Sequence, residues 1–212
     1  MFKSIKENAT TEVVEKKSKF IANVFYVESR EEAEEIIKKI NKQYHDARHN
    51  CYAYRVITSE GIIEKASDDG EPSGTAGAPM LTILSKNNLA NVLVIVTRYF
   101  GGILLGTGGL VKAYSEACTL GIEKAGIVEK YIAQVYKIEL GYSDVDKFKY
   151  FAKNNDIIIV NEEYLENVIL EVGIKEKDIL NNLAQKDINV RNIQFLKEMY
   201  VWKRRIFMAF LK

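Results

Sequence analysis

Residues that could carry chemistry gather between Asp68 and Lys112 of this 212-residue chain. The stretch opens with Asp68, Asp69 and Glu71, three carboxylates within four residues. Clustered carboxylate oxygens favour hard cations such as Mg²⁺, and paired carboxyl groups act as general acid and base where burial separates their pKa values. The same residue types also build turns, and their spacing fits no calcium loop. A turn and a functional acidic loop are therefore both open interpretations.

A run of small residues follows the acids and ends at Gly77. Its backbone N–H groups suit an anion, and Ser73 and Thr75 add hydroxyl groups. Neither hydroxyl has a recognisable base and orienting group beside it in the sequence. We therefore expect binding residues here and assign no catalytic residue.

A second glycine-rich stretch runs from Thr97 to Lys112. A buried strand, a glycine-rich loop and a helix start in succession form a common anion site, because the loop admits close backbone approach and the helix end offers unpaired N–H groups. The stretch contains no Walker A sequence and no GxGxxG, since Val111 stands where the third glycine would be. Packing of the helix against the strand explains the glycines equally well. The candidate binding residues are Arg98, Tyr99, Gly101, Gly102, Gly106, Thr107, Gly108, Gly109 and Lys112.

The only two histidines, His45 and His49, are spaced so that one helix face could hold both, and Cys51 follows them. No further Cys or His lies nearby to complete four ligands, and Cys51 begins a predicted strand. We therefore predict structural roles for these side chains, no metal site and no cofactor. Cys118 falls on the apolar face of a predicted helix, where a thiol is inert core.

The end of the chain, Tyr200 to Phe207, interleaves basic and aromatic residues. Such a segment can contact phosphates and stack on bases. A terminal strand whose apolar residues dock on the core explains the same pattern, and we predict the strand.

Composition limits the classes of function. Hydrophobic residues make up 47% of the chain and the formal net charge is +1, which argues against a basic coat that binds nucleic acid along its length. Two cysteines make no disulfide framework. The N-terminal residues lack the features of a signal peptide, and the apolar run Val92 to Val96 is far shorter than the ~20 residues of a membrane helix. We therefore expect a cytoplasmic protein with no membrane partner.

Two domains are expected to position these residues, an α+β domain over residues 1–130 and a smaller one over 131–212. In the first, strands are predicted at Thr11 to Val14, Phe20 to Val27, Cys51 to Ile57, Ile62 to Lys65 and Asn91 to Thr97, and helices at Ser29 to Gln43, Pro79 to Leu84 and along Leu110 to Ile122. The apolar run in the strand before Thr97 indicates burial on both faces.

The second domain has the predicted order βαββαβ, the split-βαβ or ferredoxin-like arrangement. Its elements are the strand Ala133 to Leu140, a helix opened by Ser143 or Asp144, the strands Ile157 to Asn161 and Tyr164 to Val172, a helix containing Ile179 to Leu183, and the strand Ile188 to Phe195.

Four motifs resemble the IMPACT/YigZ family. DDGEPSGTAGAP at Asp68 to Pro79 and VTRYFGGILLGTGGLVKAY at Val96 to Tyr114 look like its signature. KKSKFIA at Lys16 to Ala22 and HDARHNCYAYR at His45 to Arg55 are similar to the family in the same order. The C-terminal half resembles the small ferredoxin-like domain of bacterial members, which is itself similar to the last domain of elongation factor G.

The resemblance implies that the first domain adopts the two-layer fold of domain 2 in a small-subunit ribosomal protein, which elongation factor G domain IV and a superfamily of small-molecule kinases share. Eukaryotic members regulate translation by competing for a ribosome-associated activator of a starvation-sensing kinase. They do so with an additional N-terminal domain that we expect to be absent here. Both domains are similar to parts of translation factors, which suggests RNA or ribosome binding by analogy of fold.

Two functions therefore compete. The first is a translation-associated binding protein without enzymatic activity, which contacts RNA, the ribosome or a ribosome-bound partner. Its binding surface would include Arg48, Arg55, Arg98 and Lys112 together with glycine-loop N–H groups.

The alternative is an enzyme acting on a small phosphorylated or otherwise anionic substrate, with Asp68, Asp69 or Glu71 as metal ligand or base. A purely protein–protein surface with Tyr99 and Phe100 as exposed anchors is a third interpretation. Both leading hypotheses require the Asp68 loop and the Gly106 loop to share one site.

Overall fold

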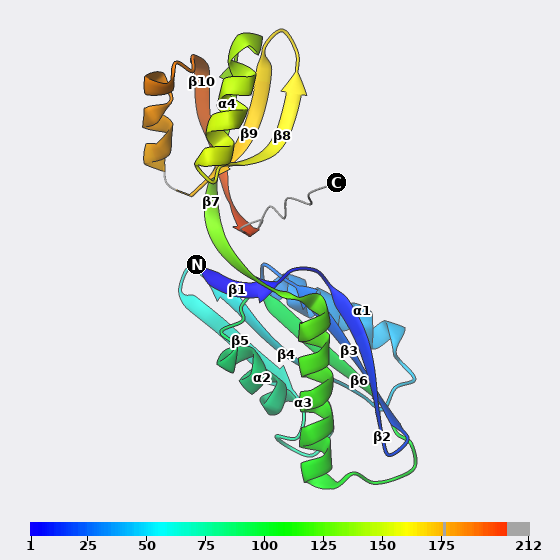
Figure 1. Cartoon of the computed structure of the whole chain (residues 1–212). Coiled ribbons are helices and arrows are strands. Elements are labelled where there is room, and N and C mark those ends of the chain that lie inside the picture. Colours follow the sequence, from blue (N-terminus) through cyan, green and yellow to red (C-terminus); the bar gives the residue numbers. More distant parts are fainter. Residues whose placement is uncertain (176, 203–212) are drawn as a thin grey trace, which may run out of the picture. The chain divides into compact units, whose positions relative to one another are not determined.

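The structure, a computed structural model, describes residues 1–175 and 177–202. The chain divides into two compact units, one over Phe2–Glu129 and one that begins at Lys130 (Figure 1). In the described ranges, no helix has the length and apolarity needed to cross a membrane.

The first unit contains a five-stranded antiparallel sheet in the order β2-β3-β6-β4-β5. Its strands are β2 (Ala9–Glu15), β3 (Ser18–Tyr26), β4 (His49–Thr58), β5 (Gly61–Ser67) and β6 (Val92–Tyr99). Its helices are α1 (Arg30–Gln43), α2 (Gly77–Lys86) and α3 (Gly106–Ala125). The short strand β1 (Phe2–Ile5), which no sequence pattern predicted, precedes them.

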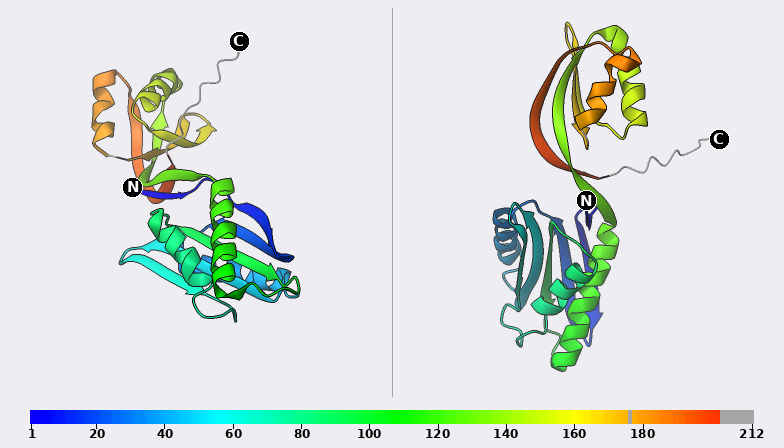
Figure 2. Two further views of the ribbon diagram at one scale, coloured as in Figure 1. Left: turned by 60° about the horizontal axis from the view of Figure 1, so that its bottom comes forward. Right: turned by 90° about the vertical axis from the view of Figure 1, so that its left-hand side faces the viewer.

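Strand β6 is buried on both faces, as its apolar run predicted. Val92, Val94 and Val96 belong to the core that α2 and α3 form with the sheet, whereas Leu93 and Ile95 belong to the core beneath α1. The expectation of two layers is therefore wrong, because helices cover both faces of the sheet (Figure 2, right). A strand that is apolar on both faces already required a third layer.

Helix α1 begins where its capping residues predict. The Ser29 side chain accepts a hydrogen bond of 3.1 Å from the Glu32 N–H, and Glu32 Oε2 accepts one of 2.7 Å from the Glu28 N–H. The helix ends at Gln43. His45 and His49 therefore do not share a helix face, and His49 is instead the first residue of β4.

Sheet register brings several segments to one end of the first unit. Lys19 at the start of β3 pairs with Tyr99 at the end of β6, and His49 pairs with Arg98. The β2–β3 turn, the start of β4 and the end of β6 therefore meet there. The loop to α3 leaves β6 at the same end (Figure 1).

The second unit follows the expected order of elements with one difference. Its elements are β7 (Ile127–Leu140), α4 (Tyr142–Asn154), β8 (Ile158–Tyr164), β9 (Val168–Ile174), the 3₁₀ helices η1 (Lys177–Asn182) and η2 (Ala184–Lys186), and β10 (Val190–Trp202). Strands β10, β7, β9 and β8 are neighbours in that order. The second helix was predicted as an α-helix, but two short 3₁₀ helices take its place.

The strand boundaries in this unit also move. Strand β8 runs on to Tyr164, so the β8–β9 turn lies at 165–167. The predicted terminal strand includes Tyr200 to Trp202, and the remainder of the Tyr200–Phe207 segment lies outside the described residues.

Candidate functional site

Asp68, in the loop between β5 and α2, caps the start of α2. Its Oδ1 accepts hydrogen bonds from the N–H groups of Ala76 (2.9 Å) and Gly77 (2.8 Å), and its Oδ2 accepts one from Gly74 (2.8 Å). Partial burial raises the pKa of this carboxyl, whereas the three N–H donors lower it. The donors have the larger combined effect, so the resulting pKa lies below its ordinary value. The local sequence needs this remote cap because Ala76, the residue at the N-cap position, has no capping side chain.

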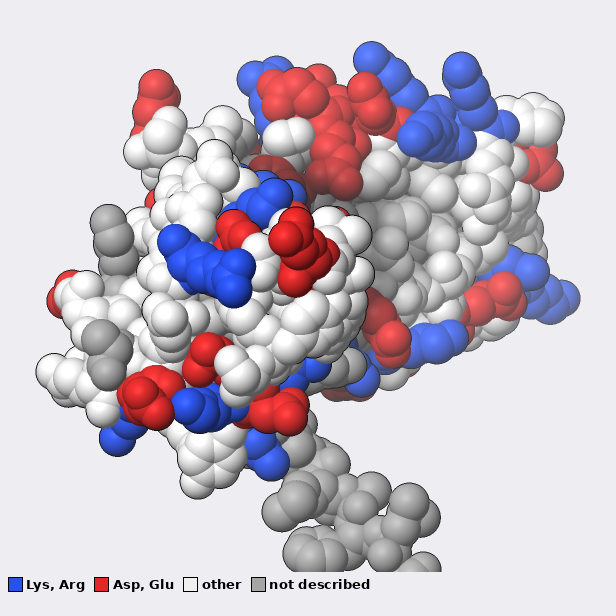
Figure 3. All heavy atoms as spheres, turned by 90° about the horizontal axis from the view of Figure 1, so that it is seen from above, with Lys and Arg blue, Asp and Glu red and all other residues white. Residues whose placement is uncertain are grey.

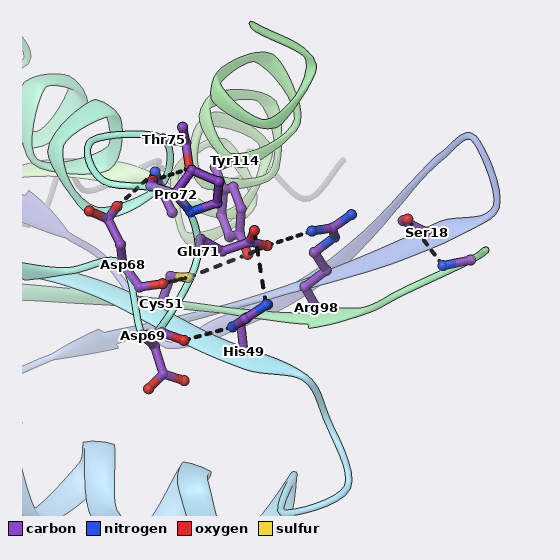
Figure 4. Close-up of polar contacts among 12 residues, drawn as sticks. Ser18, His49, Cys51, Asp68, Asp69, Glu71, Pro72, Thr75, Arg98 and Tyr114 are labelled. Carbon is purple, nitrogen blue, oxygen red and sulfur yellow. Dashed lines mark hydrogen bonds and ion pairs between the residues drawn. The ribbon is translucent and has the colours of Figure 1, made fainter. Parts of the chain in front are cut away.

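Glu71 is the centre of a buried polar cluster. Its Oε1 accepts hydrogen bonds from Arg98 Nη1 at 2.6 Å and from the Tyr114 hydroxyl at 2.8 Å, and its Oε2 lies 4.0 Å from His49 Nε2. The Glu71 and Arg98 side chains are only 3% and 6% exposed. The three partners come from β4, β6 and α3 and point toward one carboxylate (Figure 4), so Glu71 joins these elements.

The start of β4 holds the same loop through further bonds. His49 Nδ1 lies 2.6 Å from the Asp69 carbonyl oxygen, the Asn50 N–H donates to Asp69 Oδ2 at 2.6 Å, and Cys51 Sγ donates to the Asp68 carbonyl at 2.9 Å. Burial raises the pKa of the Cys51 thiol to about 12, so this thiol is protonated at neutral pH. These groups organise the loop.

The acidic loop and the end of β6 are therefore in contact. The contact is made by Glu71, Arg98 and Tyr114, all of them buried. Both functional hypotheses require a different contact, between the Asp68 loop and the Gly106 loop. The glycines at the start of α3 are not part of the buried cluster. The two loops lie at one end of the first unit, where Glu71 is buried, Asp69 is exposed and the α3 residues Gly106 and Gly108 are exposed.

Gly101 is required by close packing. A Cβ at Gly101 would lie 2.0 Å from the backbone carbon of Lys17, and the Gly101 N–H donates to Ser18 Oγ at 3.2 Å. The loop after β6 is thus held on the β2–β3 turn at its first glycine. Gly102 and Gly106 have φ of +84° and +71°, which side chains disfavour.

Gly108 has no structural requirement of this kind. It lies in the first turn of α3 with no positive φ, and a Cβ would meet nothing within 4 Å. The N-cap residue Leu105 provides no side-chain hydrogen bond, so within the described residues no N-cap side chain accepts from the N–H groups of the first turn. Thr107, Gly108 and Lys112 are exposed beside them.

Exposed cations surround this loop. Lys16 and Lys17 occupy the β2–β3 turn, Arg48 precedes β4, and Lys112 lies in α3. Across residues 1–175 and 177–202, these four side chains form no ion pair. The Arg48 guanidinium lies 5.7 Å from the centre of the Phe100 ring. We call this surface the glycine-rich end, made up of Lys16, Lys17, Arg48, Lys112 and residues 100–109.

The acidic groups closest in sequence to these four cations are Asp46, Glu15 and Glu116, which lies one turn after Lys112 in α3, so the cations outnumber them by one. The Tyr99 hydroxyl donates to Asp46 Oδ1 at 2.8 Å, and Glu15 ends β2 next to Lys16. Elsewhere the charges are mixed, and the face shown in Figure 3 intersperses both signs.

Arg55 lies away from the glycine-rich end. It pairs in register with Val92 at the opposite end of β6, and its guanidinium donates to Glu64 at 2.7 Å and to the Leu89 carbonyl at 2.7 Å. Of the remaining candidates, Ser73 is exposed, Thr75 donates to the Pro72 carbonyl at 2.6 Å, and Gly109 faces Leu105.

Sequence reasoning missed Tyr114 as a polar partner and the Lys16–Ser18 turn as a neighbour of the glycines. The sequence did contain a signal for the turn, because the KKSKFIA motif, one of the four that resemble the family, includes Lys16 to Ser18. No group of three His, Cys, Asp or Glu side chains that could hold a metal occurs in the part of the chain that the structure describes.

The architecture and this site define a class: a three-layer α+β unit with a glycine-rich loop at one end of its sheet, followed by a small antiparallel unit in which β7, α4, β8, β9 and β10 follow one another. Residues 16–122 match the Impact N-terminal domain, and residues 138–181 match a domain of unknown function, DUF1949. The chain belongs to the IMPACT family and has the domain composition of its bacterial YigZ/YvyE type.

Named relatives agree with this assignment. The chain is 41% identical over 175 residues to the IMPACT family member YvyE of Bacillus subtilis, covering 82% of this chain and 80% of that one. It is 34% identical over 160 residues to the IMPACT family member YigZ of Escherichia coli, covering 75% and 78%.

Solved structures also match. The crystal structure of a hypothetical protein matches with a TM-score of 0.61 and 27% identity, covering 92% of this chain and 97% of that chain. The structure of the two-domain translational regulator Yih1 covers 58% of this chain and 47% of that one, at 25% identity and a TM-score of 0.37.

Proposed function

We propose that this chain is a translation-associated binding protein that engages the ribosome through the glycine-rich end. Gly108 carries the proposal. A glycine in a helix costs about 0.5–1 kcal/mol relative to alanine, and among the described residues neither packing nor backbone conformation requires a glycine here. Close approach of a partner to the bare backbone of the first turn explains its presence.

The charges around Gly108 suit an anionic partner. The first turn of α3 directs uncapped N–H groups and partial positive charge outward, and Lys112 follows one turn later. Lys16, Lys17 and Arg48 are exposed and form no ion pair within the described residues. Phosphate oxygens and carboxylates are the groups that such a surface binds.

The enzyme alternative finds less support in the same geometry. Asp68 is engaged by three backbone donors, and Glu71 is engaged by Arg98 and Tyr114 in the interior. A carboxylate used in this way has few lone pairs left for a metal ion or for a substrate proton.

The translational context comes from the family. Eukaryotic members regulate translation, and the resemblance relates the first domain to a domain of a small-subunit ribosomal protein and the second to elongation factor G. Analogy of fold alone does not establish function. The family resemblance therefore supports only the choice of the ribosome as the partner to test, and the geometry around Gly108 supports the choice of binding surface.

Co-sedimentation with purified ribosomes tests the proposal. Gly108→Ala should remain folded but sediment with ribosomes at least several-fold less than the unaltered chain. Thr119→Ala, an exposed position further along α3, is the matched control and should sediment normally. The proposal fails if the unaltered chain does not sediment with ribosomes, or if Gly108→Ala does so equally well.

A further inference from the structure

Two large apolar side chains project from the glycine-rich end. Leu104 is 84% exposed and Ile103 is 43% exposed, and both lie in the loop between β6 and α3. Val111 and Phe100 on either side are also partly exposed. Single exposed leucines are ordinary, but several large apolar side chains exposed along one short glycine-rich loop mark an interaction surface.

The loop that carries these side chains is anchored at both ends. Gly101 packs against the Lys17–Ser18 backbone, and the loop continues directly into α3 at Gly106. The centre of the Phe100 ring, next to Gly101, lies 5.7 Å from the Arg48 guanidinium carbon and 5.5 Å from that of Arg98. Ile103 and Leu104 are therefore presented on a short, tethered connection, which suits insertion into a shaped pocket.

The chemistry around the apolar pair favours one class of partner. The cations of the glycine-rich end, Lys16, Lys17, Arg48 and Lys112, form no ion pairs in the described residues. The backbone N–H groups of the uncapped turn at Gly108 can donate to an anionic group. RNA offers phosphates but little that would bury an aliphatic pair. A lipid surface would bury the apolar side chains, but binding to it would not require a glycine at position 108. A polypeptide that combines carboxylates with apolar residues could contact the apolar pair, the surrounding cations and the exposed backbone at Gly108.

We infer that the glycine-rich end binds an acidic protein segment, whose apolar residues or pocket receive Ile103 and Leu104 while its carboxylates face the α3 N-terminus and the surrounding cations. This inference rests on the proposed function, since it names which component of a ribosomal assembly the same surface contacts.

The first arm of the test measures ribosome affinity. Leu104→Ala should weaken binding by roughly tenfold, the effect expected for one leucine side chain that becomes buried, and should leave thermal stability unchanged. Leu165→Ala is the matched control, because Leu165 is a leucine of the second unit that is 62% exposed. Equal affinity of Leu104→Ala and the unaltered chain would overturn the inference while leaving the proposed function intact.

The second arm does not depend on ribosome binding. A photo-crosslinking amino acid is placed at position 104 in the full chain, irradiated in a cell lysate, and the attached peptides are sequenced by mass spectrometry. Crosslinks to acid-rich peptides that survive nuclease and weaken with added salt support the inference. Crosslinks to nucleotides, salt-sensitive binding to anionic phospholipid vesicles that is lost in Leu104→Ala, or no crosslinked protein would each overturn it.

Discussion

Glu71 and Arg98, 27 positions apart in the chain, form an ion pair of 2.6 Å whose side chains are almost completely buried. The pair joins the acidic loop to the end of the central strand β6, and the Tyr114 hydroxyl extends it to α3. Two glycine-rich motifs that are separate in the sequence are thereby held at one end of the sheet.

Removing one member of this pair should be strongly destabilising. Arg98→Met leaves Glu71 as a buried carboxylate without its charge partner, which typically costs about 3–5 kcal/mol of unfolding free energy. Urea denaturation measures the loss. Arg30→Met, which removes an exposed pair with Glu34, should change stability little, and an equally small effect of Arg98→Met would contradict the structural role.

The double variant Glu71→Gln with Arg98→Met separates the pair from its neighbours. Because the two side chains share one interaction, the double variant should lose less stability than the sum of the single variants. Simple additivity would mean that the buried ion pair does not form in solution.

Asp68 should make stability depend on acid pH. Its folded pKa lies below the ordinary value because three N–H donors outweigh the effect of partial burial. A lowered folded pKa means that the stabilisation is fully present above the unfolded pKa of about 4 and disappears as the pH falls through the lower folded value.

Asp68→Asn tests that dependence through the unfolding free energy measured between neutral pH and pH 2. The unaltered chain should exceed the variant by about 1–2 kcal/mol at neutral pH, the value of a helix cap, and the difference should shrink below about pH 4. A difference that stays constant with pH would show that the carboxylate charge contributes nothing. Asp146→Asn, at an exposed position in α4, is the control for nonspecific charge effects.

Two glycines of the second motif should respond oppositely to alanine. Gly101→Ala forces a Cβ to within 2.0 Å of backbone atoms, and overpacking of this kind costs typically 1–3 kcal/mol or more. Gly108→Ala meets open space and should leave stability unchanged or raise it by up to about 1 kcal/mol. Thermal melts of both variants compare them directly, and a destabilised Gly108→Ala would remove the argument for a partner at that backbone.

Both cysteines should resist thiol reagents in the native state. Burial raises the pKa of Cys51 and of Cys118 to about 12, so almost no thiolate forms at pH 8. Mass spectrometry after iodoacetamide treatment should show no native modification and two additions after unfolding in denaturant. Rapid native alkylation of Cys51 would mean that the acidic loop opens readily.

Local patterns were sufficient for most elements of the first unit. The capping residues Ser29 and Glu32 placed the start of α1, and the apolar run of β6 predicted burial on both faces, because each signal depends on neighbours within a few residues. Patterns were weaker in the second unit, where residues 177–186 form 3₁₀ turns, since a few apolar residues at helical spacing do not specify which helix type the packing will accept.

The sequence by itself determined the family, the segment that holds the candidate site, and the residue types available there, because these depend on long contiguous motifs. Only the tertiary structure decided which of those residues face inward. The register of β3 and β4 against β6 buries Glu71 and Arg98 beside Tyr114, while the same end of the sheet leaves Gly108 and Leu104 in solvent. Burial depends on strands and a helix that meet from distant parts of the chain, and no local spacing encodes which side of a loop they will cover.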